Sequence, residues 1–296
     1  MKYILPEEVT ETMLVSSTVP LDDYTTWVAG DYTTGDEVRY DLSAYRAATA
    51  TTDRPDQGAK KDPKTWVRLG YVNRWRGLRD GPDSKTLRVG GVQYVIQAAE
   101  TVTAVSVQGC NGFELELTME DATAGVVYNE TKKLLDYEVD NLYDYLFKPP
   151  SLMPDAVFED LPPYRGAKIT IEARGGDETQ SASIGRFSMG IPVFLGDEEW
   201  GTTISGISGS VRERDGFQNL TIVPGRFIPV VNFRLVIDTP DLDRVRRALV
   251  AVADIPCPYI GDGEYSATNL FGTPADFRLT LPGVIYSYAT LEVEGY

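Results

Sequence analysis

The sequence has 296 residues, of which 28 are Lys or Arg, 44 are Asp or Glu and none is His, so its formal net charge is −16. Such a surplus of carboxylates disfavours a phosphate-backbone ligand, which requires clustered Lys and Arg, and we therefore expect no direct nucleic-acid binding. The absence of His excludes Ser-His-Asp and Cys-His nucleophile systems and His metal sites, which leaves a catalytic role only to carboxylates, Lys, Tyr or a substrate-bound metal.

Residues 1–22 are predicted to form an N-terminal strand or an extended arm. The evidence is a β-type run, Met13–Val19, that Pro20 closes. An arm of this kind either adds to a neighbour's sheet or docks within its own subunit. The first residues contain no apolar stretch of signal-peptide length, and no later run approaches the ~20 apolar residues of a membrane span. We therefore expect a soluble protein without membrane insertion, made in the cytoplasm of the cell that produces it.

Residues 23–80 are predicted to form a small module whose core is built from aromatic rings. Three of the four tryptophans of the chain lie here, in a segment otherwise rich in Gly, Asp, Thr and Lys: Trp27, Trp66 and Trp75. Each ring can bury about 150–250 Å², so a few rings can replace many missing aliphatic side chains.

Turn signals order the inside of this module. Two short alternating runs, Glu37–Tyr40 and Ala44–Ala47, predict a hairpin. The polar stretch Arg54–Lys64 predicts a long loop, after which Trp66 returns to the core.

Residues 83–196 are predicted to form a β-sandwich. Short runs with period-two alternation follow one another about eight to twelve residues apart, with Gly, Asn or Asp between them. In one such run we expect Phe113, Leu115 and Leu117 to face the core while the intervening glutamates face water. Residues Leu134–Phe147 fit either an acidic strand pair or a short helix.

Residues 200–296 are predicted to form a compact α+β lobe with one helix on one sheet face. Thr239 is the expected N-cap and Pro240 fits the first helical position. Four apolar residues then fall on one helix face: Leu242, Val245, Leu249 and Val252. We expect this helix to lie on a sheet that includes residues 277–281 and 286–293.

Several segments invite a catalytic or metal-binding interpretation, and none is adopted. The acidic groups Asp197–Glu199 and Asp262–Glu264 could pair carboxylates for glycoside cleavage or bind calcium, but we expect solvated loops. The run Gly206–Ser210 has the wrong spacing for a nucleophile elbow. Cys110 and Cys257 form either one disulfide or two isolated buried thiols, and the second is favoured. We therefore predict no catalytic residue, no metal and no cofactor.

Two groups remain as candidate sites. Trp27, Tyr32 and Trp66 could stack on sugar rings, although the favoured alternative is that they are the module's own core. Asn73, Arg74 and Trp75 lie where the module joins the sandwich, so they fit either a clasp between the two domains or an ordinary exposed strand.

The order of residues in the module resembles the chitin-binding-type carbohydrate-binding modules. The residues that carry this likeness are Trp27, Tyr32, Gly35-Asp36, Val38, Tyr45, Ala47, Pro55, Trp66 and Gly70. The continuation Gly70–Trp75 with Asp80, and the final Leu291–Tyr296, resemble bacteriophage tail-associated proteins. The chitin-binding modules often carry paired aromatics near the returning Trp, whereas Trp66 stands between Thr65 and Val67.

The resemblance implies a mainly β, non-enzymatic structural component of a bacteriophage virion tail or tail tip, acting as adaptor or host-attachment protein. Its partners would be other tail subunits in a multi-copy assembly, together with a cell-surface glycan if the module binds one. It also favours the clasp for Asn73, Arg74 and Trp75. The alternatives are a carbohydrate-binding accessory protein and a glycoside hydrolase that uses carboxylates only.

Overall fold

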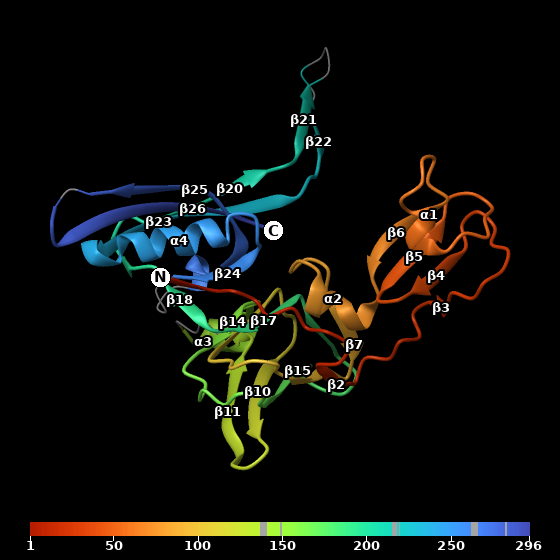
Figure 1. The fold of residues 1–296 in the computed structure, drawn as a ribbon, viewed down its shortest axis with the longest axis horizontal. Helices are drawn as coiled ribbons and strands as arrows, with labels where there is room; N and C mark the ends of the chain where they lie inside the picture. Colours follow the sequence, from red (N-terminus) through yellow and green to blue (C-terminus); the bar gives the residue numbers. More distant parts are fainter. Residues whose placement is uncertain (137–140, 149, 215–217, 219, 262–265, 282) are drawn as a thin grey trace. The chain divides into compact units, whose positions relative to one another are not determined.

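The computed structural model is mainly β, as the sequence predicts (Figure 1). It describes residues 1–136, 141–148, 150–214, 218, 220–261, 266–281 and 283–296. These residues form two compact units, a central unit of residues 8–187 and a terminal unit in which residues 1–7 join residues 188–296. No helix among the described residues is long and apolar enough to cross a bilayer.

The module at residues 23–80 lies within the central unit and contains a four-stranded sheet in the order β3-β4-β5-β6. Its elements are β3 (Thr25–Thr26), β4 (Glu37–Tyr40), β5 (Ser43–Ala47), α1 (Pro55–Gly58) and β6 (Trp66–Tyr71). The predicted hairpin is confirmed, since β4 and β5 pair antiparallel with Val38 opposite Tyr45. A small core of Val38, Tyr45, Ala47 and Trp66 holds the sheet together, so rings do replace aliphatic side chains here.

Residues Asn73–Arg79 form helix α2. This helix is not predicted from the sequence, and the alternative of an exposed strand at Asn73–Trp75 is wrong. The helix buries Trp75 and Leu78, and its preceding residue Val72 offers no side-chain cap. The amide of Asn73 instead donates a 2.8 Å hydrogen bond to Oδ2 of Asp23, fifty positions earlier. Since the group that satisfies this helix end is remote in sequence, no local signal marks the helix.

The rest of the central unit is built around a five-stranded antiparallel sheet in the order β11-β10-β15-β8-β2. Its strands are β2 (Leu14–Ser17), β8 (Val92–Gln97), β10 (Glu114–Asp121), β11 (Gly125–Lys133) and β15 (Lys168–Arg174). The predicted alternation is confirmed at Leu115 and Leu117, which are fully buried, whereas Glu114 and Glu116 lie on the other face.

Shorter elements complete this unit. They are β7 (Thr86–Val89) with β16 (Ser181–Ile184), β9 (Ala104–Gln108) with β14 (Ala156–Phe158), β12 (Leu135–Asp136) with β13 (Ser151–Leu152), and α3 (Leu142–Phe147). Strand β17 (Arg186–Gly190) contains the point in the sequence where the central unit ends, at Phe187, and the terminal unit resumes, at Ser188. Residues 134–147, for which the sequence predicts a strand pair or a short helix, thus contain both a strand, β12, and a helix, α3. Residues 137–140 of this segment lie outside the described residues.

The terminal unit is a sheet in the order β18-β1-β24-β25-β26-β23-β19, with β20 also paired to β23. The strands are β1 (Lys2–Ile4), β18 (Pro192–Phe194), β19 (Asp197–Glu198), β20 (Thr203–Ser208), β23 (Phe227–Asp238), β24 (Cys257–Ile260), β25 (Leu270–Thr280) and β26 (Tyr286–Gly295). A further pair, β21 (Val211–Arg214) with β22 (Leu220–Val223), extends from β20 and β23. Strand β1 docks between β18 and β24 of its own chain.

Helix α4 (Leu242–Ala251) covers one face of this sheet, as predicted. Val245, Leu249 and Val252 share a buried core with Phe233, Leu291 and other residues of β23 and β26. The expected cap is wrong, however. Thr239 begins a 3₁₀ turn, η1 (Thr239–Asp241), and its hydroxyl lies 2.9 Å from that of Ser287 instead of capping the helix. A second 3₁₀ turn, η2 (Ser266–Thr268), precedes β25.

Candidate functional site

The three aromatic residues singled out for sugar binding have different environments. Trp66 is completely buried, and its indole Nε1 donates a 3.0 Å hydrogen bond to the carbonyl of Asp53. Tyr32 packs edge-on against Trp66, with ring centroids 5.3 Å apart, and its hydroxyl donates to the carbonyl of Val28. Trp66 therefore has no face for a ligand, and the three rings do not form one exposed platform.

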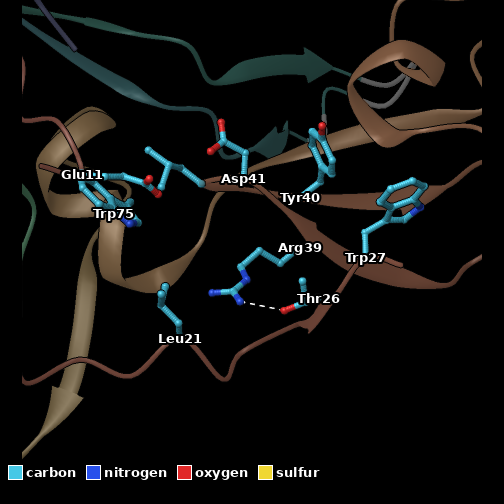
Figure 2. Close-up of a pocket in the computed structure, with 9 residues that line it drawn as sticks. Glu11, Leu21, Thr26, Trp27, Arg39, Tyr40, Asp41 and Trp75 are labelled. Carbon is cyan, nitrogen blue, oxygen red and sulfur yellow. Dashed lines mark hydrogen bonds between the residues drawn. The ribbon is translucent and has the colours of Figure 1, made fainter. Parts of the chain in front are cut away.

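Trp27 instead lines a hollow with rings that the sequence interpretation did not connect to it. We call it the Trp27–Trp75 hollow, and Figure 2 shows it. Its volume is about 400 Å³, and it is lined by Glu11, Leu21, Thr26, Trp27, Arg39, Tyr40, Asp41, Leu42 and Trp75. A volume of this size lies within the range of small-molecule sites.

Strand pairing in the module places the polar and aromatic side chains of the hollow. Strand β3 runs parallel to β4 with Thr26 opposite Arg39, and the amide of Trp27 donates to the carbonyl of Arg39 at 2.8 Å. The guanidinium of Arg39 donates to the hydroxyl of Thr26, also at 2.8 Å. Trp27 meets Tyr40 edge-on at 5.6 Å, so the ring of Trp27 is fixed by both main chain and packing.

Residues outside the four-stranded sheet of the module complete the hollow. Trp75, on helix α2, is almost fully buried and lies beneath the guanidinium of Arg79, 5.8 Å from the ring centroid. Glu11 and Leu21 come from the segment before the module. Together with Arg39 and Asp41 they give a site that offers aromatic surface, one cation and two carboxylates. Such a site suits a neutral ligand with an apolar face and several hydroxyl or amide groups.

Sequence reasoning missed most of these residues. Arg39, Tyr40 and Asp41 belong to the hairpin that the sequence does predict, so the alternation along that strand was an available signal. No pattern links Glu11 or Leu21 to Trp27, because only the folded chain brings these segments together.

The residues proposed as a clasp all lie in helix α2. The side chain of Asn73 pairs with the main chain of Leu87 on β7, donating from Nδ2 at 2.9 Å and accepting at Oδ1 at 3.0 Å. Arg74 donates from Nε to the carbonyl of Val19 at 2.6 Å. Trp75 packs inward. Helix α2, at the C-terminal end of the module, is thereby hydrogen-bonded both to the N-terminal segment and to a strand beyond the module.

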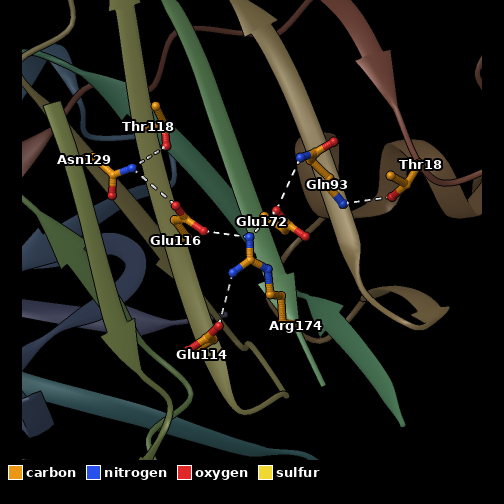
Figure 3. Close-up of polar contacts among 8 residues, drawn as sticks. All are labelled: Thr18, Gln93, Glu114, Glu116, Thr118, Asn129, Glu172 and Arg174. Carbon is orange, nitrogen blue, oxygen red and sulfur yellow. Dashed lines mark hydrogen bonds and ion pairs between the residues drawn. The ribbon is translucent and has the colours of Figure 1, made fainter. Parts of the chain in front are cut away.

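The outer face of the five-stranded sheet carries a second polar cluster (Figure 3). Arg174 pairs with Glu116 at 2.7 Å, Glu172 at 2.9 Å and Glu114 at 3.3 Å. The hydrogen bond from Arg174 holds the pKa of Glu172 below its usual value. A glycosidase acid requires the opposite shift. The cluster therefore acts as a network of ion pairs that crosses β10 and β15.

The other acidic candidates add no site among the described residues. Asp197 and Glu198 form the short strand β19, paired with β23. Residues 262–264 lie outside the described residues. Within the described part of the chain no three His, Cys, Asp or Glu side chains are grouped so as to hold a metal. Cys110 and Cys257 are free, buried thiols, which confirms the favoured alternative.

Comparison of the chain with protein-family models and with curated proteins finds no match.

Proposed function

We propose that the chain is a non-enzymatic structural component of a bacteriophage virion tail or tail tip, acting as an adaptor or host-attachment protein. The phage assignment is supported by the likeness of Gly70–Trp75 and of the C-terminal segment to tail-associated proteins. The structural role is supported by one feature of the terminal unit, a projecting β-arm with exposed apolar side chains.

This β-arm consists of β20, the β21–β22 pair and the first residues of β23. Figure 1 shows that β21 and β22, which form a two-stranded sheet of their own, run beyond the eight-stranded sheet of the terminal unit. Every residue of β20, β21 and β22 is exposed. Six of its large apolar side chains are Ile204, Ile207, Val211, Leu220, Ile222 and Phe227.

The β-arm is built to keep its shape while exposed. Phe227, 63% exposed, lies over Gly206, where an added Cβ would come within 2.0 Å of its ring. A long strand pair with apolar side chains and free edges is an aggregation hazard for a protein that remains alone in solution. In an assembly the same surface is covered by a neighbouring subunit, which is the arrangement we propose.

The test is to locate the protein in lysates of the cells that produce it. An antibody raised against the purified chain is used for gradient sedimentation and for immunogold labelling in negative stain. We expect the antigen to sediment with particles and gold to mark one end of a tail. Antigen found only at the top of the gradient, at the 32.7 kDa mass of a single chain, would refute the assignment.

A second candidate function is glycan binding in the Trp27–Trp75 hollow, which suits a host-attachment role. The observation that favours it is the combination of Trp27 and Tyr40 with Arg39 and Asp41 around a volume of about 400 Å³. Aromatic rings stack on the apolar face of a pyranose, while charged side chains form hydrogen bonds with its hydroxyl groups.

Titration of tryptophan fluorescence with an N-acetylglucosamine tetramer, followed by a glycan array, tests this candidate. We expect saturable quenching that Trp27→Ala and Arg39→Ala abolish. Trp200→Ala is the matched control, because Trp200 is 90% exposed and does not line the hollow. Quenching that survives in Trp27→Ala but is lost in Trp200→Ala would place any sugar site elsewhere.

A further inference from the structure

One face of the β21–β22 pair combines cations with aliphatic side chains. In the register of this pair Arg212 lies opposite Ile222 and Arg214 opposite Leu220. Because opposite and alternate residues share a face, these four side chains project together. Among the described residues neither arginine takes part in an ion pair. This surface, the cationic face of the β-arm, is therefore apolar and positively charged in a chain of net charge −16.

The sheet of the terminal unit has a face with the opposite character. Helix α4 and the core occupy the side of β26 to which Ala289, Leu291 and Val293 point. The alternate residues of β26 point to the other side and are exposed or partly exposed: Tyr286, Tyr288, Thr290, Glu292 and Glu294. This surface, the acidic face of β26, presents two phenol rings and two carboxylates in one line.

The negative charge of this face is only partly compensated locally, because Arg234 of β23 and Arg278 of β25 both lie opposite Thr290. Asp276 of β25 lies directly opposite Glu292, and two like charges facing each other across a strand pair are destabilising. Arg278 pairs with Asp276 at 3.1 Å. Within the described residues neither Glu292 nor Glu294 has an ion pair. A cation supplied from outside the unit would relieve the repulsion.

The two faces match in spacing as well as in charge. Arg212 and Arg214 are two positions apart on one strand, and so are Glu292 and Glu294 on another. Alternate residues on a strand are about 6.6 Å apart, so both pairs can meet at once. In the same arrangement the aliphatic side chains of Leu220 and Ile222 lie beside the two arginines and cover one side of the ion pairs, which limits their contact with water.

We infer that the cationic face of the β-arm of one copy docks on the acidic face of β26 of a second copy, in a head-to-tail contact. The inference rests on the proposed structural function and names its partner, because both complementary surfaces belong to this one chain. The β21–β22 pair runs beyond the eight-stranded sheet (Figure 1), and all of its residues are exposed. A head-to-tail contact leaves a free β-arm at one end and a free acidic face at the other, and it therefore builds rings or filaments.

Charge reversal in two sets of variants tests the contact. The arm variant carries Arg212→Glu and Arg214→Glu, and the face variant carries Glu292→Arg and Glu294→Arg. Each is studied by size-exclusion chromatography with light scattering, over a concentration series and at low and high salt. The matched control, Arg246→Glu with Arg247→Glu, makes the same charge change as the arm variant on the exposed side of α4.

We expect the wild-type chain and the control to form multimers that high salt weakens. The arm variant and the face variant should each elute as 32.7 kDa monomers at concentrations where the wild-type chain is multimeric. An equimolar mixture of the two variants should assemble again, since the acidic arm of one fits the basic face of the other. The chain with all four substitutions should also recover self-assembly, which shows that the single sets had not merely unfolded.

A wild-type chain that stays monomeric throughout the series, multimers that persist in either charge-reversed set, or a mixture that fails to reassemble would each overturn the inference. Failure here is distinguishable from failure of the proposed function. If gold marks virus particles while the isolated chain is monomeric, the structural role stands and the β-arm contacts a different subunit. If the isolated chain assembles but the gold label marks no virus particle, the contact stands and the phage assignment fails.

Discussion

The hydroxyl of Tyr94 on β8 donates a 2.8 Å hydrogen bond to the main-chain carbonyl of Arg74 in helix α2. The same oxygen lies 2.8 Å from Oγ1 of Thr86. Thr86 in turn donates to the carbonyl of Asn73 at 2.6 Å and accepts from the amide of Gly77 at 2.9 Å. Two fully buried side chains thus satisfy main-chain groups of helix α2, and Tyr94 connects this helix to the five-stranded sheet.

Replacement of these hydroxyls should destabilise the central unit. We expect Thr86→Val to lower the free energy of unfolding by about 2 kcal/mol, because the hydrogen bonds of the Thr86 hydroxyl to the Asn73 carbonyl and from the Gly77 amide are both lost. Tyr94→Phe should cost about 1 kcal/mol, since it removes one partner of Arg74. Urea denaturation followed by circular dichroism measures both, with the exposed Thr280→Val as control. A loss in the control equal to that in Thr86→Val would contradict this role.

Gly77→Ala should destabilise the protein although Ala favours helices. Ala is preferred over Gly inside a helix by about 1 kcal/mol. At this position, however, an added Cβ would come within 2.9 Å of the carbonyl oxygen of Ile184 and 3.2 Å of Oγ1 of Thr86. We expect a lower melting temperature in thermal unfolding. Gly30→Ala is the control, because its nearest neighbour would be 4.0 Å away. A raised melting temperature for Gly77→Ala would show that helix α2 does not pack so closely.

The tryptophans of the module should differ sharply in their effect on stability. Trp66→Ala removes a fully buried indole, for which we expect a loss of about 3–5 kcal/mol. Trp27→Ala should cost clearly less, because Trp27 is only partly buried at the edge of the hollow. Guanidinium denaturation of both variants gives the comparison. Equal losses would indicate that Trp27 is also a core residue and would remove the basis for a ligand site there.

Both cysteines should be inert in the folded protein. They are fully buried, and burial raises the pKa of the Cys110 thiol to about 12 and that of Cys257 to about 11. A thiol at pH 8 is then almost entirely protonated and a poor nucleophile. We expect an aromatic disulfide reagent to titrate no thiol in the native protein and two after denaturation. Fewer than two thiols in the denatured, unreduced protein would instead point to a disulfide.

Stability at acidic pH should depend on Asp53. Its carboxylate accepts hydrogen bonds from Lys61 at 2.7 Å and Thr65 at 2.8 Å, and these hold the pKa of Asp53 below its ordinary value. A carboxyl with a lowered pKa stabilises the fold above its unfolded-state pKa and loses that contribution as pH falls through the folded-state value. The stability difference between wild type and Asp53→Asn should therefore be largest near pH 7 and shrink below about pH 4. A difference that does not change between pH 7 and pH 2 would rule out this linkage.

The sequence predicts those elements whose evidence is local. The hairpin at residues 37–47 follows from two alternating runs around a turn. Helix α4 follows from apolar residues at helical spacing, and the buried positions of β10 follow from period-two alternation. In each case the signal lies within a dozen residues, because side-chain direction repeats along a helix or strand.

Elements that depend on remote partners were not predictable in the same way. Helix α2 has its first amide satisfied by Asp23, so no capping residue announces it. Thr239 has a residue type that is common at helix N-caps, but its hydroxyl is hydrogen-bonded to the hydroxyl of Ser287 on β26. Propensity is a weak guide wherever a tertiary hydrogen bond competes with the local one.

The sequence by itself determined that this protein is mainly β, that its early segment must be held together by aromatic rings, and that no His-based chemistry is open to it. Composition and period suffice for such statements because they concern which residues are present and which face they share. Only the tertiary structure decided that Trp66 is a core ring while Trp27 lines a hollow with Trp75, and that Arg212 and Arg214 share a face with Leu220 and Ile222. Those facts depend on which distant segments of the chain come into contact. Such tertiary contacts determine the burial of a side chain and the register of a strand pair, whereas the intrinsic propensity of a single residue does not.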